Sequence, residues 1–529
     1  MLPLRNLLSV QHPFSEKDLA HLQNMGKKPS DAVHEYLSLI HGAPHTKLRR
    51  PCSAGDGILQ LSAAERERYA REFRTHADRG RAMKFVAASG AASRMFKTHI
   101  RYCALDGVNR RQLLAEKASG SPEAEELLRF FDNLPRFPFF GQLRLKLASR
   151  GLDLDNLACA GSYSPILHCL LDSDGMGYGD APKGLIPFHA YPDGARTPFE
   201  EHLLEAAGYL RDGRGAVRVH FTVPPEDEAR VRQHLEGAAR RFMTPETSYD
   251  ATLSIQDRST DAVALTARGS LIRGTDGHPR LWPSGHGALL KNLNDLQADI
   301  VFVRTIDNVL PDRLKDTVAF FKRVLGGLLA ELQVHIFHTL EMLESGDPGR
   351  KELGDIEEWS REFLNLRFPR AAQDAGFAAK RRMLFESLNR PLRVCAMVKH
   401  DGEPGGGPFW VGDESGEETL QIIEGAQVDV SSEEQKTIWE SSSYFNPADL
   451  VCGVRDHRGN PFDLAAYADP NAAFVSNKAG TAGGIRVLER PGLWNGSMAR
   501  WNTVFVEVPK ATLCPAKTIL DLLRPEHQV

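Results

Sequence analysis

An acidic residue at the end of a predicted strand is the first candidate for chemistry in this chain. Residues 300–306 are mostly apolar and β-branched, which predicts a strand, and Asp307 and Asn308 follow directly. In open α/β sheets, ligands bind beyond the carboxyl ends of the strands. Mg²⁺ usually takes one or two carboxylates together with phosphate oxygens, so Asp307 is a candidate metal ligand. The alternative is an ordinary turn, because Asp-Asn is common turn chemistry.

A small-residue loop upstream could bind phosphate. It follows a strand predicted at residues 83–88 and contains Ser89, Gly90, Ser93 and Arg94. Small residues let backbone N–H groups approach a phosphate, and a helix that starts there adds the positive end of its dipole. The guanidinium of Arg94 could bind phosphate oxygens through two hydrogen bonds. The alternative is a tight strand–helix turn that packs closely.

A second cation lies between two backbone-restricting residues. Lys183 stands between Pro182 and Gly184, and a helix start is predicted at Thr197-Pro198. Such a lysine is a positioned point charge that suits a phosphate. The alternative is a solvated lysine near a helix cap, because most lysines are exposed.

Two further segments suit a nucleotide and a sugar. The loop Gly285-His286-Gly287 precedes the strand at 300–306, and its glycines would allow close backbone approach. Trp494, with Asn495 and Glu489, offers an apolar ring face and hydrogen bonds for sugar hydroxyls. The alternative for Trp494 is a buried ring that anchors a turn.

Alternating strands and helices must position these residues. Further strands are predicted at 217–223, 251–255, 262–265, 392–399 and 504–508, with helices at 198–210, 226–242 and 313–345. This alternation predicts an α/β fold with a mostly parallel central sheet. We expect a helical N-terminal extension at residues 1–80, an α/β core at 81–312, a helical segment at 313–390 and a mixed α+β part at 391–529.

Taken in order, these segments resemble the UDP-sugar pyrophosphorylases, in particular the UDP-N-acetylglucosamine pyrophosphorylase type, as a divergent bacterial branch. The family's glycine-rich signature loop is similar to residues 89–94, and its Pro-Lys-Gly-Leu motif is similar to 182–185. Its Gly-Asn-Gly-Gly-Leu and Val-Asp-Asn motifs resemble residues 285–289 and 306–308, and a strand-closing glutamine resembles Gln256. The resemblance covers about residues 83–310 and implies the GT-A-like fold of sugar nucleotidyltransferases.

The resemblance implies transfer of a nucleoside monophosphate from a nucleoside triphosphate, UTP being expected, to a sugar 1-phosphate, with release of pyrophosphate. It implies that Arg94 binds the leaving phosphates, Lys183 neutralises the α-phosphate, and Asp307 holds Mg²⁺. A second metal carboxylate is expected, with Asp449, Asp456 and Asp463 as candidates. The implied nucleotide contacts are Ser89, Gly90, Ser93, Gln256, Gly285, His286 and Gly287, and the sugar contacts are Asn308, Glu489, Trp494 and Asn495.

The chain departs from the family pattern at three positions. Ser89 and Ala92 replace two signature glycines, and His286 replaces the asparagine that reads the nucleobase. If Ala92 needed a positive φ, its Cβ would add strain of about 1 kcal/mol or more. A nucleotide-sugar binding protein without turnover is therefore an alternative. Another is a metal-dependent glycosyltransferase, because Asp172-Ser173-Asp174 has the form of a metal-binding DxD motif.

The bulk composition excludes several classes of protein. The 529 residues suggest two or three domains, and the net charge of 65 − 69 = −4 gives no electrostatic case for nucleic acid or anionic membranes. No apolar run approaches the roughly 20 residues of a membrane span. The seven cysteines form no CxxC pair, so we expect reduced thiols and a cytoplasmic protein. The oligomeric state does not follow from the sequence.

Overall fold

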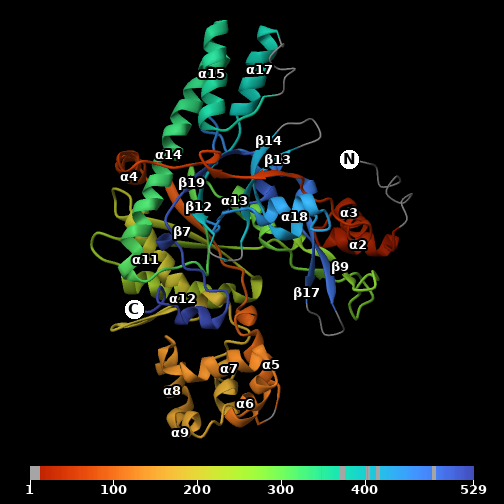
Figure 1. Ribbon diagram of the computed structural model, residues 1–529, viewed down its shortest axis with the longest axis vertical. Coiled ribbons are helices and arrows are strands. Elements are labelled where there is room, and N and C mark those ends of the chain that lie inside the picture. Colours follow the sequence, from red (N-terminus) through yellow and green to blue (C-terminus); the bar gives the residue numbers. More distant parts are fainter. Residues whose placement is uncertain are drawn as a thin grey trace. The chain divides into compact units, whose positions relative to one another are not determined.

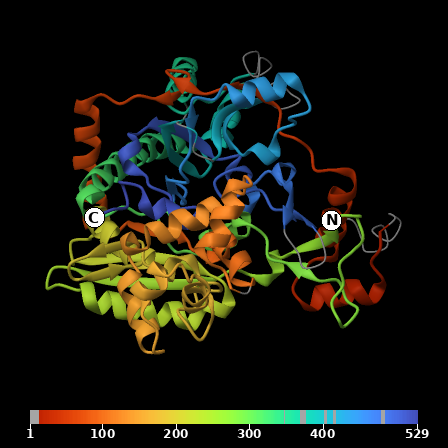
Figure 2. The same cartoon turned by 60° about the horizontal axis from the view of Figure 1, so that its bottom comes forward.

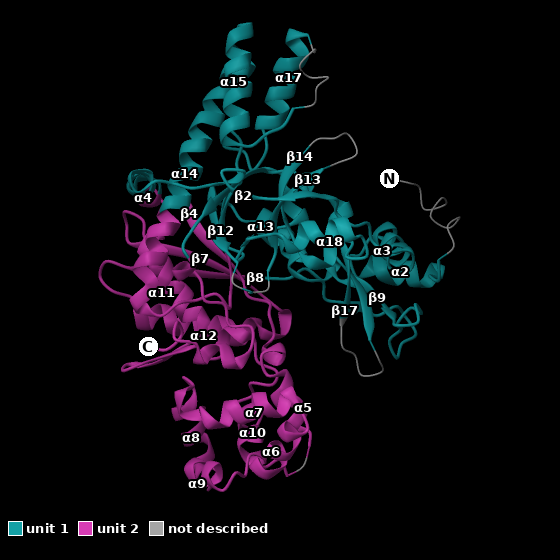
Figure 3. Cartoon of the chain, in the orientation of Figure 1, with its two compact units in different colours: residues 1–76, 254–303, 324–509 teal, residues 77–253, 304–323, 510–529 magenta. Residues whose placement is uncertain are grey.

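Two units make up the chain in its computed structural model. The structure describes residues 12–105, 107–346, 348–368, 376–400, 402, 405–412, 418–478 and 484–529. Unit 1 comprises residues 1–76, 254–303 and 324–509, and unit 2 comprises 77–253, 304–323 and 510–529 (Figure 3). Each unit is assembled from segments far apart in sequence. The consecutive boundaries predicted at residues 80, 312 and 390 stay a prediction.

The largest sheet in unit 1 is built around buried apolar strands. Strand β12 is buried along all but its last residue, as a strand covered on both faces must be. Parallel pairs are β2–β3, β3–β19 and β19–β12, whereas β16 runs antiparallel between β12 and β11. In sheet order the strands are β2 (Ser53–Ala54), β3 (Gly57–Leu59), β19 (Asn502–Glu507), β12 (Leu392–Lys399), β16 (Leu450–Gly453) and β11 (Ile300–Thr305), and β15 (Tyr444–Phe445) adds to β12.

Two small antiparallel sheets complete the strands of unit 1. One contains β1 (Leu48–Pro51), β13 (Gly407–Gly412) and β14 (Glu418–Ile423), and the other contains β10 (Leu281–Trp282), β9 (Ala262–Thr266), β18 (Ile485–Glu489) and β17 (Phe474–Lys478). Helix α3 packs on β9 and β18, and α15 lies beside α17 (Figure 1). The helices are α2 (Glu16–Asn24), α3 (Pro29–His41), α4 (Ala63–Asp78), α13 (Leu290–Asn294), α14 (Asp312–Ser345), α15 (Arg350–Phe363), α17 (Phe377–Leu388) and α18 (Glu433–Glu440).

Unit 2 places helices against a short parallel sheet. Strands β4 (Ala82–Ala87) and β7 (Ala216–Val223) are parallel, and β8 (Ser248–Ile255) follows β7. Helix α11 (Pro198–Leu210) packs on β4 and β7, and α12 (Glu228–Phe242) packs on α11 (Figure 2). Thr197 and Glu200 form a capping box that starts α11, with Pro198 in its first turn. A hairpin of β5 (His189–Tyr191) and β6 (Gly194–Arg196) precedes this helix.

A helical insertion separates the small-residue loop from Lys183. Its aromatic core includes Phe131 stacked on Tyr163 at 3.7 Å, and Ile519 and Leu522 from the C-terminal segment join that core. The insertion therefore fixes the C-terminal segment of unit 2. Its helices are α5 (Lys97–Cys103), α6 (Arg110–Ala118), α7 (Pro122–Asp132), α8 (Phe140–Ala148), α9 (Leu154–Cys159) and α10 (Ser164–Leu171).

The predicted α/β class with a mostly parallel central sheet is confirmed. The helix predicted at 198–210 has those bounds, as does the strand at 392–399. The N-terminal extension, expected to be helical over residues 1–80, also contains the strands β1, β2 and β3 at 48–59. These strands are only two to four residues long, too short for a visible alternation, and their partners include the distant β13 and β19.

Within the described residues, no helix combines the length and apolar character needed to cross a membrane.

Candidate functional site

In unit 2, the ends of β4 and β7 meet the segment that follows β11. After β11, the backbone N–H of Ile306 donates to the carbonyl of Ala87 at the end of β4, at 3.1 Å. The N–H of Ala88 donates to the carbonyl of Thr222 near the end of β7, at 3.2 Å. This convergence places Asp307 beside the small-residue loop, at the edge where α/β sheets bind ligands.

Asp307 is held by two lysines. The ammonium of Lys183 lies 3.1 Å from Oδ2 of Asp307 and donates a second hydrogen bond to the carbonyl of Ala516, also at 3.1 Å. The ammonium of Lys517 lies 3.4 Å from the same Oδ2. The side chains of Asp307 and Lys183 are 9 % and 8 % exposed, whereas that of Lys517 is 52 % exposed. One carboxylate thus joins a buried cation and a solvent-facing cation.

The two lysines determine the charge of Asp307. Burial alone would raise the pKa of its carboxyl, but the positive charges of Lys183 and Lys517 outweigh burial and hold the pKa well below its ordinary value. Asp307 is therefore ionised at neutral pH. Its other oxygen, Oδ1, is buried and has no hydrogen-bond partner among the described residues.

Asp307 fits the Mg²⁺ that the resemblance implies. An ionised carboxylate with an unpartnered oxygen fits a cation that takes one or two carboxylates and otherwise phosphate oxygens. Elsewhere, among the described residues, the one group of three or more potential His, Cys, Asp or Glu ligands is Cys103, His168 and Asp172. Asp307 therefore offers Mg²⁺ a single ligand, and Asp456 and Asp463, named as second-ligand candidates, accept backbone hydrogen bonds in their own turns.

Backbone contacts position Lys183. Its N–H donates to the carbonyl of Gly90 at 3.0 Å, and the N–H of Ala92 donates to the carbonyl of Ala181, also at 3.0 Å. Gly184 is required because a Cβ there would lie 2.5 Å from the ring of Phe199. The small-residue loop and the Pro-Lys-Gly segment, predicted separately, therefore lie side by side.

The altered signature loop carries no backbone strain at Ala92. This residue is fully buried at the start of a 3-10 helix (Ala92–Arg94) and is not among the described non-glycine residues with positive φ. The condition for strain, a positive φ at Ala92, is therefore not met. Gly90, Ser93 and Arg94 are exposed, Ser89 is partly exposed, and Arg94 has no ion-pair partner among the described residues.

Asn308 connects Asp307 to the protein interior. Its Oδ1 accepts hydrogen bonds from the N–H of Cys514 at 3.0 Å and from the guanidinium of Arg304 at 3.1 Å. Arg304 also pairs with Glu205 at 3.0 Å, and Glu205 pairs with Lys84 at 2.8 Å, all fully buried. Asn308 was predicted to contact a sugar, but this oxygen binds the C-terminal segment that carries Lys517.

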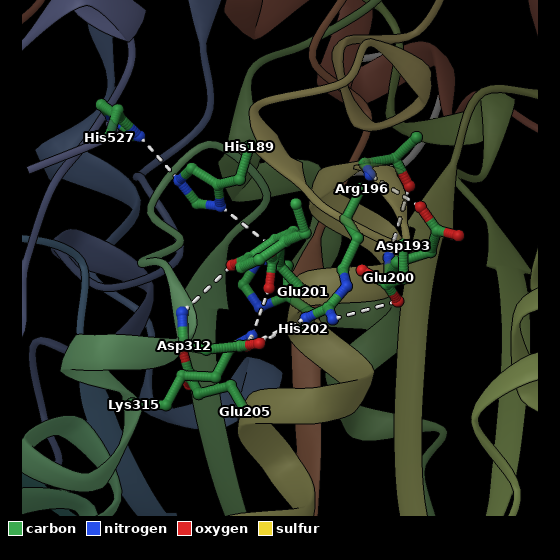
Figure 4. A network of polar contacts seen from close by, with 12 residues as sticks. His189, Asp193, Arg196, Glu200, Glu201, His202, Glu205, Asp312, Lys315 and His527 are labelled. Atoms are coloured by element: carbon green, nitrogen blue, oxygen red, sulfur yellow. Dashed lines mark hydrogen bonds and ion pairs between the residues drawn. The ribbon is translucent and has the colours of Figure 1, made fainter. Parts of the chain in front are cut away.

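A second polar network holds the end of the C-terminal segment. His189 lies 2.8 Å from Glu201 and 3.0 Å from His527, and Lys315 pairs with the other oxygen of Glu201 (Figure 4). Burial, together with the nearby charges of His189 and Arg524, lowers the pKa of His527 to about 3, so this ring is neutral. The network therefore helps to fix the segment that brings Lys517 to Asp307.

In unit 1, the predicted glycine loop packs against its own protein. The N–H of Gly285 donates to the Glu489 carboxylate, and a Cβ at Gly287 would collide with the carbonyl of Pro491. The side-chain amide of Gln256 donates to the carbonyl of Ser284 at 3.1 Å. The two glycines thus have a packing reason beside the predicted nucleotide contact.

The structure brings His286 and Trp494 together. Their rings stack at 4.0 Å, and Nδ1 of His286 accepts from the N–H of Leu493 at 2.9 Å. The proton of a neutral ring is therefore on Nε2, 3.4 Å from Glu424. Asn495 is buried, and both polar atoms of its amide lack a hydrogen-bond partner within the described parts of the chain. Such an amide usually binds a ligand or water.

The predicted site residues thus form two groups, one in each unit. Sequence reasoning missed Lys517, because a lone lysine in Pro515-Ala516-Lys517 carries no motif. It also missed the networks of Glu205 and of His189 with His527. The group in unit 2 is Ser89, Gly90, Ser93, Arg94, Lys183, Asp307 and Asn308, and the group in unit 1 is Gln256, Gly285, His286, Gly287, Glu489, Trp494 and Asn495.

The two acids of the DxD-like segment have different partners. Asp172 lies 2.8 Å from Nδ1 of His168, whereas Asp174 pairs with Arg150 at 2.9 Å. The carboxylates therefore do not share a partner, as the two acids of a metal-binding DxD pair would.

Comparisons with known proteins give a family and several similar folds. A family model described as "Domain of unknown function (DUF4301)" matches residues 15–528. No curated protein matches the chain in sequence. The uridine diphosphate N-acetylglucosamine pyrophosphorylase of Trypanosoma brucei is 12 % identical, with 98 % of this chain and 81 % of that chain covered and a TM-score of 0.47. A UDP-glucose pyrophosphorylase variant of Leishmania major is 11 % identical, with 97 % and 79 % covered and a TM-score of 0.43.

Proposed function

We infer the function from the site itself, because the chain belongs to the family described as Domain of unknown function (DUF4301). We propose that the protein is a nucleotidyltransferase that transfers a nucleoside monophosphate, from UTP in the first instance, to a sugar 1-phosphate. The observation that carries this proposal is the ionised Asp307, held by Lys183 and Lys517 at a strand-end edge, with one carboxylate oxygen that has no hydrogen-bond partner in the described part of the chain. The order of motifs that resembles the UDP-sugar pyrophosphorylases supports it.

The proposed reaction needs positioned charge more than covalent help. A phosphate oxygen of the sugar 1-phosphate attacks the α-phosphorus, the bond from that phosphorus to the bridging oxygen breaks, and pyrophosphate leaves. No general base is required, because a phosphate monoester with a second pKa near 6 is largely a dianion at neutral pH. The protein must hold the two substrates in line and neutralise the charge that develops on phosphate oxygens.

The lysines fit this task. An ammonium has three N–H donors, and Lys183 uses two of them, on Asp307 and on Ala516. The third can bind an α-phosphate oxygen while the other two keep the ammonium in place. Lys517 is half exposed, so it can turn toward incoming phosphates, and Arg94 is free to bind the leaving pyrophosphate. Asp307 would hold Mg²⁺, which would neutralise negative charge on the phosphates.

Unit 1, taken by itself, contains polar and aromatic residues that suit a nucleotide or a sugar. The buried amide of Asn495 has unused donors and an unused acceptor, which suits sugar hydroxyls or a nucleobase edge. His286, with its proton on Nε2, takes the place of the base-reading asparagine, and Trp494 covers its ring. We propose these residues and Gln256 as specificity contacts.

The test incubates the protein with Mg²⁺, a panel of nucleoside triphosphates and a panel of sugar 1-phosphates, and measures the pyrophosphate released. We expect release with at least one pair of substrates and its loss in Lys183→Ala and Asp307→Asn. The control is Asp155→Asn, which removes an exposed carboxylate paired with Arg144 on the helical insertion. Tight nucleotide binding without turnover across the panel would refute the transferase and leave a binding protein. Transfer of sugar from a nucleotide sugar to an acceptor, without pyrophosphate, would indicate a glycosyltransferase.

A further inference from the structure

Three donor atoms converge where two helices of the insertion end. Cys103 is the last residue of α5, and His168 and Asp172 lie four residues apart at the end of α10, which packs against α5. The sulfur of Cys103 is 3.5 Å from Nδ1 of His168 and 4.0 Å from Oδ1 of Asp172. Nδ1 of His168 is 2.8 Å from Oδ2 of Asp172. The proposed transferase reaction uses none of these residues.

The arrangement of Cys103, His168 and Asp172 differs from that of a catalytic proton relay. In a Cys-His-Asp triad, the two ring nitrogens face different partners, because one nitrogen receives the proton and the other is oriented by the acid. Here the single atom Nδ1 faces both the sulfur and the carboxylate. Donor atoms that all point to one place are the arrangement of metal ligands.

The sulfur–nitrogen distance matches that between two ligands of a tetrahedral ion. Zinc bonds of about 2.3 Å to sulfur and about 2.0–2.1 Å to nitrogen or oxygen place a sulfur and a nitrogen ligand about 3.6 Å apart, and nitrogen and oxygen about 3.4 Å apart. The observed sulfur–nitrogen distance of 3.5 Å meets this value, and the nitrogen–oxygen distance of 2.8 Å must widen. The His168 and Asp172 side chains are both about half exposed, which leaves them room to rotate.

The backbone around Asp172 is fixed in advance. Residues 175–179 fold back over the end of α10: the N–H groups of Gly175 and Gly177 both donate to the carbonyl of Asp172 at 2.9 Å. A Cβ at Gly175 would collide with the carbonyl of Cys169, so glycine is required there. The acid, the histidine and the packed cysteine are therefore held on rigid elements, as a metal site requires.

We propose that Cys103, His168 and Asp172 form a zinc site with three protein ligands and an open fourth position for water. The thiol and imidazole select a borderline-soft cation and disfavour Mg²⁺ or Ca²⁺, which prefer oxygen ligands. The ion would join the ends of α5 and α10. The site involves none of the residues around Asp307 and does not depend on the proposed transferase activity.

The test uses the full-length protein after removal of metals with a chelator. Zn²⁺ alone is titrated in competition with a chromophoric chelator, and Co²⁺ is added separately to record the absorption spectrum. We expect one equivalent of Zn²⁺ per chain, a thiolate-to-cobalt absorption band in the near ultraviolet, and at least 100-fold weaker Zn²⁺ binding in Cys103→Ser with the band lost. Cys159→Ser, an exposed cysteine on α9 of the same insertion, should bind as the wild type does.

Two results would overturn the proposal: the absence of stoichiometric Zn²⁺ binding, or binding and a cobalt spectrum that survive in Cys103→Ser. Circular dichroism shows whether each variant is folded. If Cys103→Ser does not fold, His168→Gln and Asp172→Asn decide, because both side chains are about half exposed and neither is needed for packing. Wild-type affinity in both of these variants would exclude the site.

Discussion

Replacement of Lys517 by alanine should separate activity from stability. Its ion pair with Asp307 is long, at 3.4 Å, and the lysine side chain is 52 % exposed. Exposed pairs contribute about 0–1 kcal/mol to the free energy of unfolding, so Lys517→Ala should destabilise the protein by less than about 1 kcal/mol. Asp307 keeps the closer, buried pair with Lys183 and stays ionised.

The effect on catalysis should be much larger. Removal of one preorganised group that stabilises developing charge costs about 10²–10³ in kcat, or about 2.7–4 kcal/mol of transition-state stabilisation. We therefore expect Lys517→Ala to release pyrophosphate at least 100-fold more slowly while its urea unfolding midpoint hardly moves.

The assay compares pyrophosphate release and urea unfolding in the same preparations. Lys117→Ala is the matched control, because Lys117 is 48 % exposed and pairs with Glu125 at 2.9 Å on the helical insertion. Lys117→Ala should also destabilise the protein by less than about 1 kcal/mol, because it removes one exposed ion pair, and it should keep full activity. Equal rates in Lys517→Ala and the wild type would refute the reasoning, as would a loss of activity fully explained by unfolding.

Three further predictions concern stability. Glu205→Gln should lower the free energy of unfolding by about 3–5 kcal/mol, because it leaves buried Lys84 and Arg304 without their carboxylate. The control is Glu228→Gln, since the Glu228 carboxylate pairs with Arg232 near the surface. It should change the free energy of unfolding by less than about 1 kcal/mol in the same urea titration. Gly184→Ala should destabilise by about 1–3 kcal/mol, since its Cβ would lie 2.5 Å from Phe199, whereas Gly141→Ala, with open space around the Cβ, should not. Burial lowers the pKa of His99 to about 3 from an ordinary value of 6.5, so the unfolded chain takes up the proton first and stability falls as pH drops from about 6.5 to 3. His99→Phe should reduce that slope by about 1.4 kcal/mol per pH unit in pH-dependent urea titrations, and an unchanged slope would contradict the burial argument.

The sequence predicted the elements of the site better than their contacts. A mostly apolar and β-branched run followed by Asp307 could be recognised as a strand end, because strand burial and turn chemistry are local properties. Lys183 and Gly90 could be assigned to loops for the same reason, although the whole helical insertion lies between them in the sequence. Their direct contact is set by tertiary packing.

Contacts made by distant segments could not be predicted. Lys517 reaches Asp307 only because the C-terminal segment is held by Asn308, by His189 and by the aromatic core of the insertion. Asn308 was expected to bind sugar, but the pattern Asp-Asn does not reveal that its Oδ1 accepts from Cys514. Whether Ala92 needed a positive φ could not be decided from the family loop, and its ordinary backbone was visible only in the structure.

The reverse reaction is the most direct test of the proposed nucleotidyltransferase activity. Wild-type protein with Mg²⁺, labelled pyrophosphate and a panel of nucleotide sugars should transfer the label into a nucleoside triphosphate. We expect the wild type to form labelled UTP from at least one UDP-sugar, and Lys183→Ala to form no labelled UTP above background. No label in any triphosphate with folded wild-type protein, or equal incorporation by Lys183→Ala, would contradict it.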